Sequence, residues 1–340
     1  MRVSTVWLEF AAALGLIAFG GARLARYGEA IGHHTGLGTT GVGLFLLATV
    51  TSLPELVTGV SAVQFANAPD IAVGAILGSC VFNVMIIAIL DFSLERVSLY
   101  DRVNRSHVLS ACFGVLLIGT VGFCLFGDLD LAMPGFASVG IYTPLLLLGY
   151  WVAVRTLMAE EGRFVDPEFA DRAIDEPEMD SARAWWGFGV AALAVVAAGI
   201  WLPFVGERIA ARLDVQDTFA GTLFIAFATS LPEIVVALAA LRQGAPNLAV
   251  SNVLGSNIFN IVILVPLDLL YREGPLLAGV SELHLLSVIA AVSMSAVAML
   301  AVLVRPRQNL FPRMGSASAV LVTIYLLNLY AMYVLGRAGE

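Results

Sequence analysis

The sequence predicts an all-α polytopic membrane protein with about ten transmembrane helices, arranged as two inverted five-helix repeats. Of its 340 residues, 59% are hydrophobic and 13% are charged, and the mean hydropathy is +0.89. The apolar residues fall into blocks of roughly 20, the length that an α-helix needs to cross a ~30 Å hydrocarbon layer. An internal repeat, whose copies are separated by an odd number of blocks, predicts the inversion.

The apolar blocks give ten expected spans. They run approximately over residues 6–25, 39–64, 70–91, 106–126, 136–156, 185–204, 217–241, 248–271, 282–304 and 316–335. The first block follows a short charged start, as in a signal peptide, but it has no clear small-residue cleavage site. We therefore expect it to be retained as the first transmembrane helix.

An acidic connection separates the two halves, 1–156 and 185–340. Residues 157–184 hold nine acidic residues and three arginines, which is typical of a solvated and poorly ordered linker. The chain contains no lysine, and thirteen of its eighteen arginines fall on the same side of the ten spans as this linker. The positive-inside rule then predicts a cytoplasmic linker and both termini outside, in the plasma membrane.

A repeated segment relates the halves. One copy begins at Gly28 and the other at Gly206, and at this offset of 178 both contain TSLPE, at 51–55 and 229–233. The following span repeats LGS and FN at an offset of 177. The repeats extend over about 39–91 and 217–268. Because five spans separate the copies, the second enters the membrane from the opposite side, an architecture that many secondary transporters use.

Two glutamates, Glu55 and Glu233, lie near the middle of the second and seventh expected spans. A carboxylate at the bilayer centre costs on the order of 2.5 kcal/mol or more, so it rarely lies there without a function. A proline precedes each glutamate and is expected to break the helix, freeing the carbonyls of Val50 and Ala228. Carbonyls freed in this way can serve as cation ligands.

Hydroxyl and amide side chains recur near the glutamates at i,i+3 and i,i+4 spacings, which share a helix face. They are Thr51, Ser52, Thr229 and Ser230, with Ser79, Asn83, Ser256 and Asn260 in the following spans. Each of these groups alone could instead bond within its own helix or to a neighbouring helix. Their repetition in both halves favours an all-oxygen site for a hard cation such as Ca²⁺.

The remaining polar residues are interpreted as structural or solvated. The expected interfacial charges at span ends are Asp91, Asp268, Glu29 and Glu207. The histidines form no metal-binding spacing and are interpreted as solvated, in or near loops: His33, His34, His107 and His284. The cysteines make no CxxC pattern and are expected to be small packing residues: Cys80, Cys112 and Cys124.

At the repeated motifs the sequence resembles the calcium/cation antiporter superfamily and, within it, the sodium/calcium exchangers. The two α-repeats of that family carry a TSLPE-type motif followed by GSNxxN or GSNxxD. The resemblance implies that Glu55 and Glu233 coordinate Ca²⁺ centrally and that Asn83 and Asn260 complete the centre. The groups that it implies for the sodium subsites are Thr51, Ser52, Thr229, Ser230, Ser79, Ser256 and the carbonyls of Ala48 and Ala226.

The chain departs from the family pattern at several positions. Val50 and Ala228 stand where glycine commonly precedes TSLPE, and Cys80 replaces the asparagine of GSN in the first copy. Asn260 stands where potassium-dependent members carry aspartate. The resemblance therefore does not extend to potassium co-transport.

The expected function is secondary antiport of Ca²⁺ for Na⁺ by alternating access. Exchange of H⁺ for Ca²⁺ through the same glutamates stays open. A cation channel is less favoured because it would not explain the inverted duplication. No enzyme motif is present, no cofactor is expected beyond the transported ions, and no basic surface suggests nucleic acid. The expected partner is the lipid bilayer.

Overall fold

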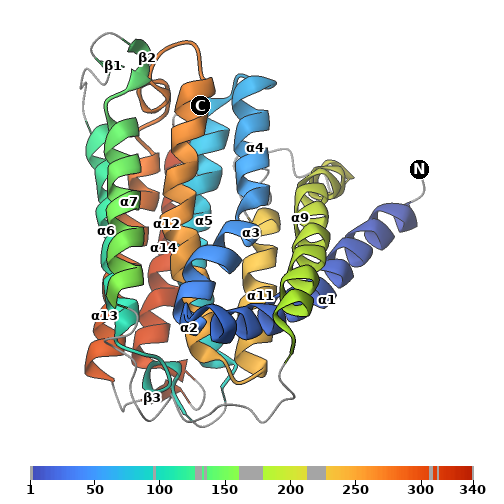
Figure 1. Ribbon diagram of the computed structural model, residues 1–340. Coiled ribbons are helices and arrows are strands. Elements are labelled where there is room, and N and C mark those ends of the chain that lie inside the picture. The colour runs from blue at the N-terminus through green and yellow to red at the C-terminus, as the bar shows by residue number, and fades with distance from the viewer. Residues whose placement is uncertain are drawn as a thin grey trace.

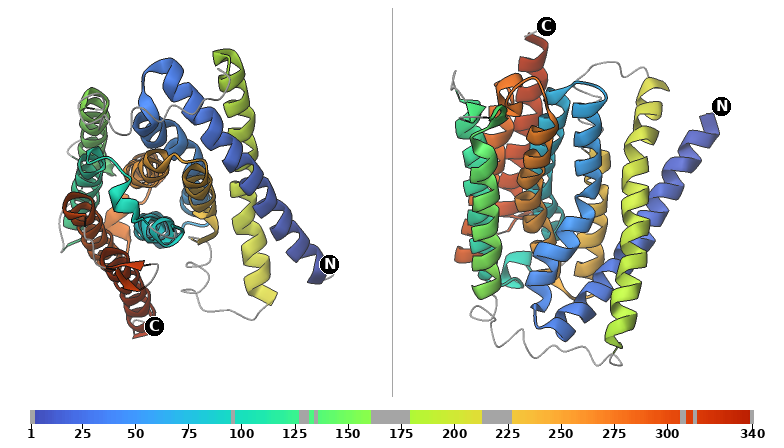
Figure 2. Two further views of the ribbon diagram at one scale, coloured as in Figure 1. Left: turned by 90° about the horizontal axis from the view of Figure 1, so that it is seen from below. Right: turned by 45° about the horizontal axis from the view of Figure 1, so that its top comes forward.

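The computed structural model describes residues 3–94, 97–126, 132–133, 136–160, 179–212, 227–305, 309–311 and 314–338. In this part of the chain most helices run side by side along one axis and form a bundle (Figure 1). Two long helices, α1 (Val3–Thr35) and α9 (Ser181–Arg212), pack against each other on one side of this bundle (Figure 2). The acidic segment 161–178 lies outside the described residues.

The first half continues from α1 with a segmented second span. This span consists of α2 (Gly38–Gly41), the π-helix η1 (Val42–Leu47), α3 (Ala48–Thr51) and α4 (Leu53–Gln64). The rest of the half comprises α5 (Pro69–Phe92), the 3₁₀ turn η2 (Leu99–Asp101), α6 (Ser106–Leu125), strands β1 (Ala132–Met133) and β2 (Phe136–Gly140), and α7 (Tyr142–Glu160).

The second half follows the same order of elements. After α9 it comprises α11 (Leu231–Arg242), α12 (Pro246–Leu270), the 3₁₀ turn η3 (Leu276–Gly279), α13 (His284–Val304), strands β3 (Asn309–Phe311) and β4 (Met314–Gly315), and α14 (Ser316–Ala338). Each strand pair is a short antiparallel hairpin that precedes the last helix of its half.

The described helices have the length and hydropathy of a membrane bundle. Seven of them could each span a bilayer, and the pair 42–51 and 53–64 forms an eighth span bent by 42°. The protein is therefore an integral membrane protein. Two predicted boundaries are wrong: the first helix continues to Thr35 instead of ending near residue 25, and residues 136–140 form β2 instead of starting the fifth helix. Apolar residues fit both a buried strand and a helix end, so hydropathy could not separate the two.

Repeat-related residues meet in the middle of the bundle. The Cys80 thiol lies 3.9 Å from the Asn257 carbonyl, and these two residues occupy equivalent positions of α5 and α12. The backbone of α9 at Gly199 lies close to both repeat-related prolines, Pro54 and Pro232. Contacts between equivalent residues are expected near the pseudo-two-fold axis of an inverted repeat.

Asp91 and Asp268 are buried, with 3% and 0% of their surfaces exposed, so the prediction that they are interfacial charges is wrong. Asp91 Oδ1 accepts hydrogen bonds from Leu99 N at 2.8 Å and Ser98 Oγ at 3.0 Å. Its Oδ2 accepts one from Ser318 Oγ at 2.6 Å. Asp91 thus joins the end of α5 to the following turn and to the start of α14.

Asp268 does the same in the second half. Its Oδ1 accepts hydrogen bonds from Leu276 N at 2.8 Å and from the Tyr142 hydroxyl. Its Oδ2 accepts from Gly140 N at 2.8 Å and Thr143 Oγ1 at 2.5 Å. A buried carboxylate requires such donors. These donors come from the loop after α12 and from the first half of the chain. The position of Asp268 near a span end could therefore not reveal them from the sequence.

Two of the four histidines are also buried, contrary to prediction. His107 and His284 are 1% and 7% exposed. His107 Nε2 lies 3.0 Å from Asn247 Oδ1, and His284 Nε2 lies 3.0 Å from Asp70 Oδ1. The other two are exposed, as predicted: His33 and His34. Each buried histidine therefore links the start of a helix in one half to the start of a helix in the other half.

Candidate cation site

The two TSLPE segments break their helices in the same way. Ser52 and Ser230 are non-helical, with φ, ψ of −91°, 5° and −84°, 2°, and a new helix begins at the next residue in each half. The proline lies in the first turn of α4 and α11, where a missing N–H costs no intrahelical hydrogen bond. The predicted break is thus confirmed. It places Glu55 and Glu233 in a first helical turn, where the helix dipole favours a negative charge.

All predicted side-chain ligands in the second, third, seventh and eighth spans are buried. Glu55 is 1% exposed, and the others are fully buried: Glu233, Thr51, Ser52, Ser79, Asn83, Thr229, Ser230, Ser256 and Asn260. Ala48 is buried as well, whereas Ala226 lies outside the described residues. This burial excludes bulk water, so the polar groups can be stabilised only by one another or by a bound ion.

The hydroxyls of each half contact the glutamate of the other half. Ser52 Oγ donates to Glu233 Oε1 at 3.1 Å, and Ser230 Oγ lies 3.5 Å from Glu55 Oε1. Ser79 Oγ donates to the same Glu55 oxygen at 3.4 Å and accepts from Ser230 Oγ at 3.0 Å. The break in each helix turns its serine across the pseudo-two-fold axis, which the i,i+3 spacing in an unbroken helix did not predict.

The threonines extend this pairing. Thr51 Oγ1 lies 3.4 Å from Ser256 Oγ and 3.4 Å from the Ala48 carbonyl oxygen. Thr51 also contacts Glu233, and Thr229 contacts Glu55. The predicted residues of spans two, three, seven and eight therefore converge on one region in the described part of the chain.

Several buried oxygens in this region have no hydrogen-bond partner. They are Glu55 Oε2, Glu233 Oε2 and the amide oxygens of Asn83 and Asn260. A buried polar group left unpaired costs about 1–3 kcal/mol. In native proteins such unpaired groups usually have a functional reason. Carboxylate and amide oxygens are the ligands that Ca²⁺ prefers, so a cation would satisfy these four groups.

One further buried amide was missed from the sequence. Asn252 of α12 is fully buried, and neither of its amide atoms has a hydrogen-bond partner. Its spacing was a usable signal, because Asn252, Ser256 and Asn260 lie four residues apart and share a helix face. The first copy has Ala75 at the equivalent position, so a search for repeated residues passed over it.

The chemistry of the site suits a hard cation. Two carboxylates supply the charge, and the neutral ligands are hydroxyl and amide oxygens. Within the described ranges no group of three or more His, Cys, Asp or Glu side chains could hold a metal ion, which argues against a transition-metal centre there. Ca²⁺ accepts six to eight oxygens in flexible geometry and fits this set.

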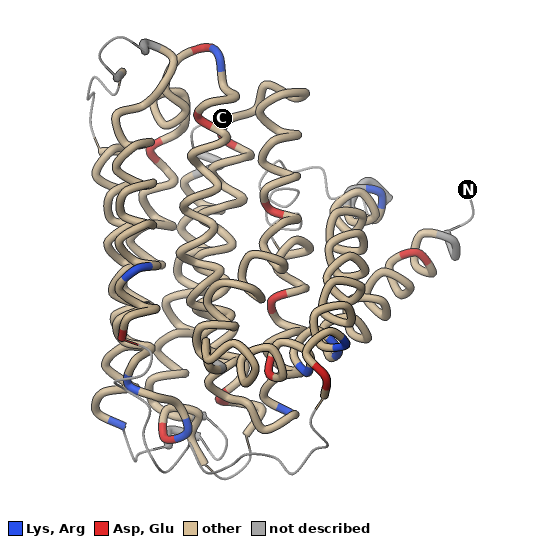
Figure 3. The backbone as a smooth tube through the Cα atoms, viewed as in Figure 1, with Lys and Arg blue, Asp and Glu red and all other residues tan. Residues whose placement is uncertain are grey.

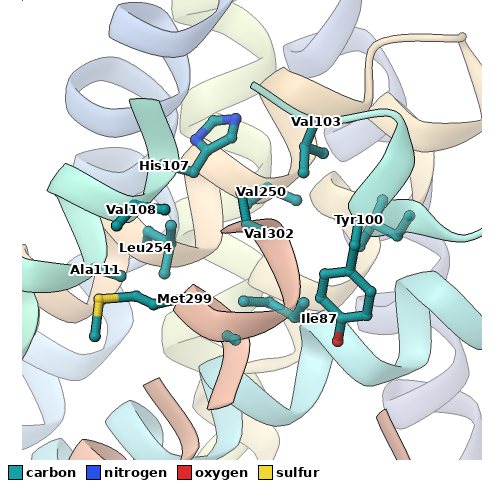
Figure 4. A pocket seen from close by; sticks show the side chains of 12 residues that line it. Ile87, Tyr100, Val103, His107, Val108, Ala111, Val250, Leu254, Met299 and Val302 are labelled. Atoms are coloured by element: carbon teal, nitrogen blue, oxygen red, sulfur yellow. The ribbon is translucent and has the colours of Figure 1, made fainter. Parts of the chain in front are cut away.

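An apolar cavity lies apart from these groups. It is enclosed by α5, α6, α12 and α13 and is lined by side chains such as Ile87, Leu254 and Met299, with Tyr100 and His107 at its edge (Figure 4). No carboxylate lines it. This cavity therefore lacks the carboxylates that mark the central region.

Charged residues are concentrated toward the two ends of the bundle, and isolated acidic positions lie at mid-height (Figure 3). The basic positions gather at the end where α7 stops and α9 starts (Figures 1 and 3). This is the distribution that the arginine count predicts for a protein that spans a membrane.

A family model for the sodium/calcium exchanger protein matches residues 5–158 and 183–338. The chain belongs to the sodium/calcium exchanger family. Two relatives of this exchanger are similar over different lengths. The inner membrane protein YrbG of Escherichia coli is 27% identical over 235 residues, which cover 68% of this chain and 70% of that protein. The sodium/calcium exchanger MaX1 of Methanosarcina acetivorans is 47% identical over 70 residues, or 20% of each chain.

Solved structures support the same fold for the exchanger. A structure of the sodium-calcium exchanger NCX_Mj has a TM-score of 0.73 at 20% identity and covers 97% of this chain and 99% of that chain. The predicted fold of ten helices in two inverted repeats is confirmed. Family membership makes the protein a membrane exchanger of cations.

Proposed function

We propose that this exchanger carries Ca²⁺ across the membrane in exchange for Na⁺, using one site between Glu55 and Glu233. The observation that carries the proposal is the pair of buried glutamates, each with one oxygen in contact with a serine of the opposite half and one oxygen without a partner. Two carboxylates balance the charge of one Ca²⁺ or of the monovalent ions that replace it. Ca²⁺ and Na⁺ bound together would carry more positive charge than the two carboxylates can balance.

The cross-half hydrogen bonds support alternating access. Ser52 contacts Glu233, and Ser230 contacts Glu55, so a movement of one half against the other alters both contacts together. An inverted repeat provides two related arrangements in which the site opens to opposite sides. The groups proposed to bind the ion are therefore the same groups whose contacts change during the movement.

The ligand assignment follows the same geometry. Glu55, Glu233, Asn83 and Asn260 have unpartnered oxygens and are proposed to bind Ca²⁺. The hydroxyls around them are proposed to form the Na⁺ subsites with two backbone carbonyls: Thr51, Ser52, Ser79, Thr229, Ser230 and Ser256, with Ala48 and Ala226. No cofactor is required beyond the transported ions.

The orientation is part of the proposal. The larger share of arginines lies on the side of the 157–184 linker, so we place this side in the cytoplasm and both termini outside, in the plasma membrane. The bilayer is the partner that the exposed apolar helix faces imply, with Trp186 and Leu193 of α9 among them.

Ion-gradient experiments in reconstituted vesicles test the proposal. Vesicles loaded with Na⁺ are diluted into Na⁺-free medium with labelled Ca²⁺, while pH and membrane potential are clamped. We expect saturable Ca²⁺ uptake that disappears when choline replaces internal Na⁺. Uptake that requires a pH gradient and ignores Na⁺ would instead establish H⁺ as the counter-ion. Uptake that is non-saturable and independent of both ions would indicate a channel.

A further inference from the structure

Three buried asparagines share one unusual property in the described residues. Asn83, Asn252 and Asn260 are fully buried, and neither the oxygen nor the nitrogen of each side-chain amide has a hydrogen-bond partner. In three other buried asparagines only the amide oxygen is buried without a partner: Asn104, Asn257 and Asn328. Two of the three members are proposed Ca²⁺ ligands. The third, Asn252, is not part of the repeated ligand set.

The position of Asn252 separates it from the central ion. It lies one helical turn before Ser256 and two turns before Asn260, or about 6 Å and 12 Å along α12. Oxygens that bind one Ca²⁺ lie within about 5 Å of each other, since each is about 2.3–2.6 Å from the ion. Asn252 and Asn260 therefore cannot share an ion, and Asn252 belongs to a second position on the same face.

Asn252 lies on α12 between the central ligands of this helix and the end where the helix begins. The helix α12 packs closely on the π-helix η1 here. A Cβ added to Gly43 would lie 1.9 Å from Ser251 Oγ, and one added to Gly255 would lie 2.5 Å from the Leu44 carbonyl oxygen. π-helical segments interrupt regular helix hydrogen bonding and are frequent at functional sites. The end in question is the one where α12 begins, which also carries most of the basic positions (Figures 1 and 3).

The second position is present in only one half. The residue of α5 that is equivalent to Asn252 is Ala75, which is buried and offers no side-chain oxygen. The central ligands, in contrast, repeat in both halves. The equivalent buried positions of α5 and α12 therefore differ in polarity between the two halves.

We propose that Asn252 is an additional cation-binding residue, which forms a peripheral station on the route between the central site and the membrane face where α12 begins. The inference rests on the proposed function. A neutral amide oxygen binds a partly hydrated cation weakly, so the ion can pass on to the carboxylates. Because Ala75 occupies the equivalent place, the station serves one face only.

Side-resolved kinetics test this proposal. The KM for Ca²⁺ is measured in right-side-out and in everted vesicles. A protease-sensitive tag at the C-terminus shows which side is exposed, because the C-terminus lies at the opposite end from the start of α12 (Figure 1). Asn252→Ala is expected to raise KM about 3- to 10-fold when Ca²⁺ enters from the α12 start, the loss expected for one oxygen contact. KM from the other face is expected to stay within a factor of about two.

Two variants complete the design. Asn252→Ser keeps one oxygen and should give an intermediate, equally one-sided shift. Asn328→Ala removes a buried amide from α14 and should leave both KM values unchanged. If wild-type protein exchanges Ca²⁺ but Asn252→Ala has an unchanged KM, or a KM raised equally from both faces, the station at Asn252 is overturned. Wild-type protein without any Ca²⁺ exchange would instead refute the proposed function itself.

Discussion

Ser52 Oγ donates a hydrogen bond to Glu233 Oε1 across 3.1 Å, although 181 residues separate the two in sequence. The repeat-related hydroxyl, Ser230 Oγ, lies 3.5 Å from Glu55 Oε1 and donates to Ser79 Oγ, which itself donates to Glu55 Oε1. Each half of the exchanger therefore completes the site of the other. A hydroxyl that donates to one carboxylate oxygen keeps the carboxylate oriented and leaves its second oxygen for a cation.

We expect Ser52→Ala and Ser230→Ala each to weaken Ca²⁺ binding. Ser52→Ala removes the hydrogen bond that Glu233 accepts from the opposite half, and Ser230→Ala removes the hydroxyl that donates to Ser79, which in turn donates to Glu55. The apparent Kd for Ca²⁺ should therefore rise about 10-fold in each variant. Titration calorimetry on purified protein measures this change. Ser61→Ala is the matched control because Ser61 lies in the same helix, α4, beyond Glu55. Equal shifts in Ser52→Ala and Ser61→Ala would show that the contact with Glu233 has no special role.

Asp268 should behave differently from the two glutamates. Asp268 accepts hydrogen bonds from two backbone N–H groups and two side-chain hydroxyls, and both of its oxygens are engaged. Asp268→Asn places an amide N–H₂ among these donors and should lower the free energy of unfolding by about 3 kcal/mol. Thermal unfolding in detergent measures the loss. An unchanged melting temperature would contradict the structural role of Asp268.

Sequence reasoning grouped the residues that converge in the structure because the motif is duplicated. TSLPE contains a proline, a glutamate and two hydroxyl residues within five consecutive positions. These residues stay close together whatever the tertiary structure is. Sequence reasoning could not identify which half each serine serves, because the break at Ser52 redirects the side chain. The roles of Asp91 and Asp268 were also missed, since their donors lie in loops and helices far along the chain.

Gly43 is expected to be intolerant of a side chain. A Cβ there would lie 1.9 Å from Ser251 Oγ and 2.9 Å from the Leu248 carbonyl oxygen, so η1 and α12 would have to separate. We expect Gly43→Ala to reduce Ca²⁺ flux severely and to lower the melting temperature. Gly114→Ala is the control, because no atom lies within 4 Å of its added Cβ. That variant should be as stable as wild type or gain up to about 1 kcal/mol, the helix propensity of alanine over glycine. Similar behaviour of the two variants would refute the close packing.

The two histidine links should differ in strength. Asn247 Oδ1 is buried and accepts from Asn104 N at 2.8 Å beside His107. Its counterpart Asp70 is more than half exposed, where water can replace a lost acceptor. Asn247→Ala should therefore cost about 1–3 kcal/mol of unfolding free energy, and Asp70→Ala distinctly less. Thermal or denaturant unfolding of the two variants in the same detergent compares them. A larger loss for Asp70→Ala would contradict this reasoning.

Replacing either central glutamate should abolish transport without unfolding the protein. Glu55→Gln and Glu233→Gln each remove one charge and keep size and one oxygen, and a neutral amide is less costly to bury than a carboxylate. We expect no Ca²⁺ flux from either variant and a melting temperature equal to or above that of wild type. Loss of flux that merely accompanies unfolding would leave the two glutamates without the proposed role as ligands.

The most direct test of a single shared site is titration of Ca²⁺ into purified protein at a series of Na⁺ concentrations. The structure and charge of the site predict one tightly bound Ca²⁺ per chain, an apparent Kd that rises steadily as Na⁺ increases, and no tight binding in Glu55→Gln or Glu233→Gln. Choline chloride at the same ionic strength should leave the Kd unchanged. A Ca²⁺ affinity that Na⁺ does not alter, or that survives loss of either glutamate, would contradict exchange through a common site at Glu55 and Glu233.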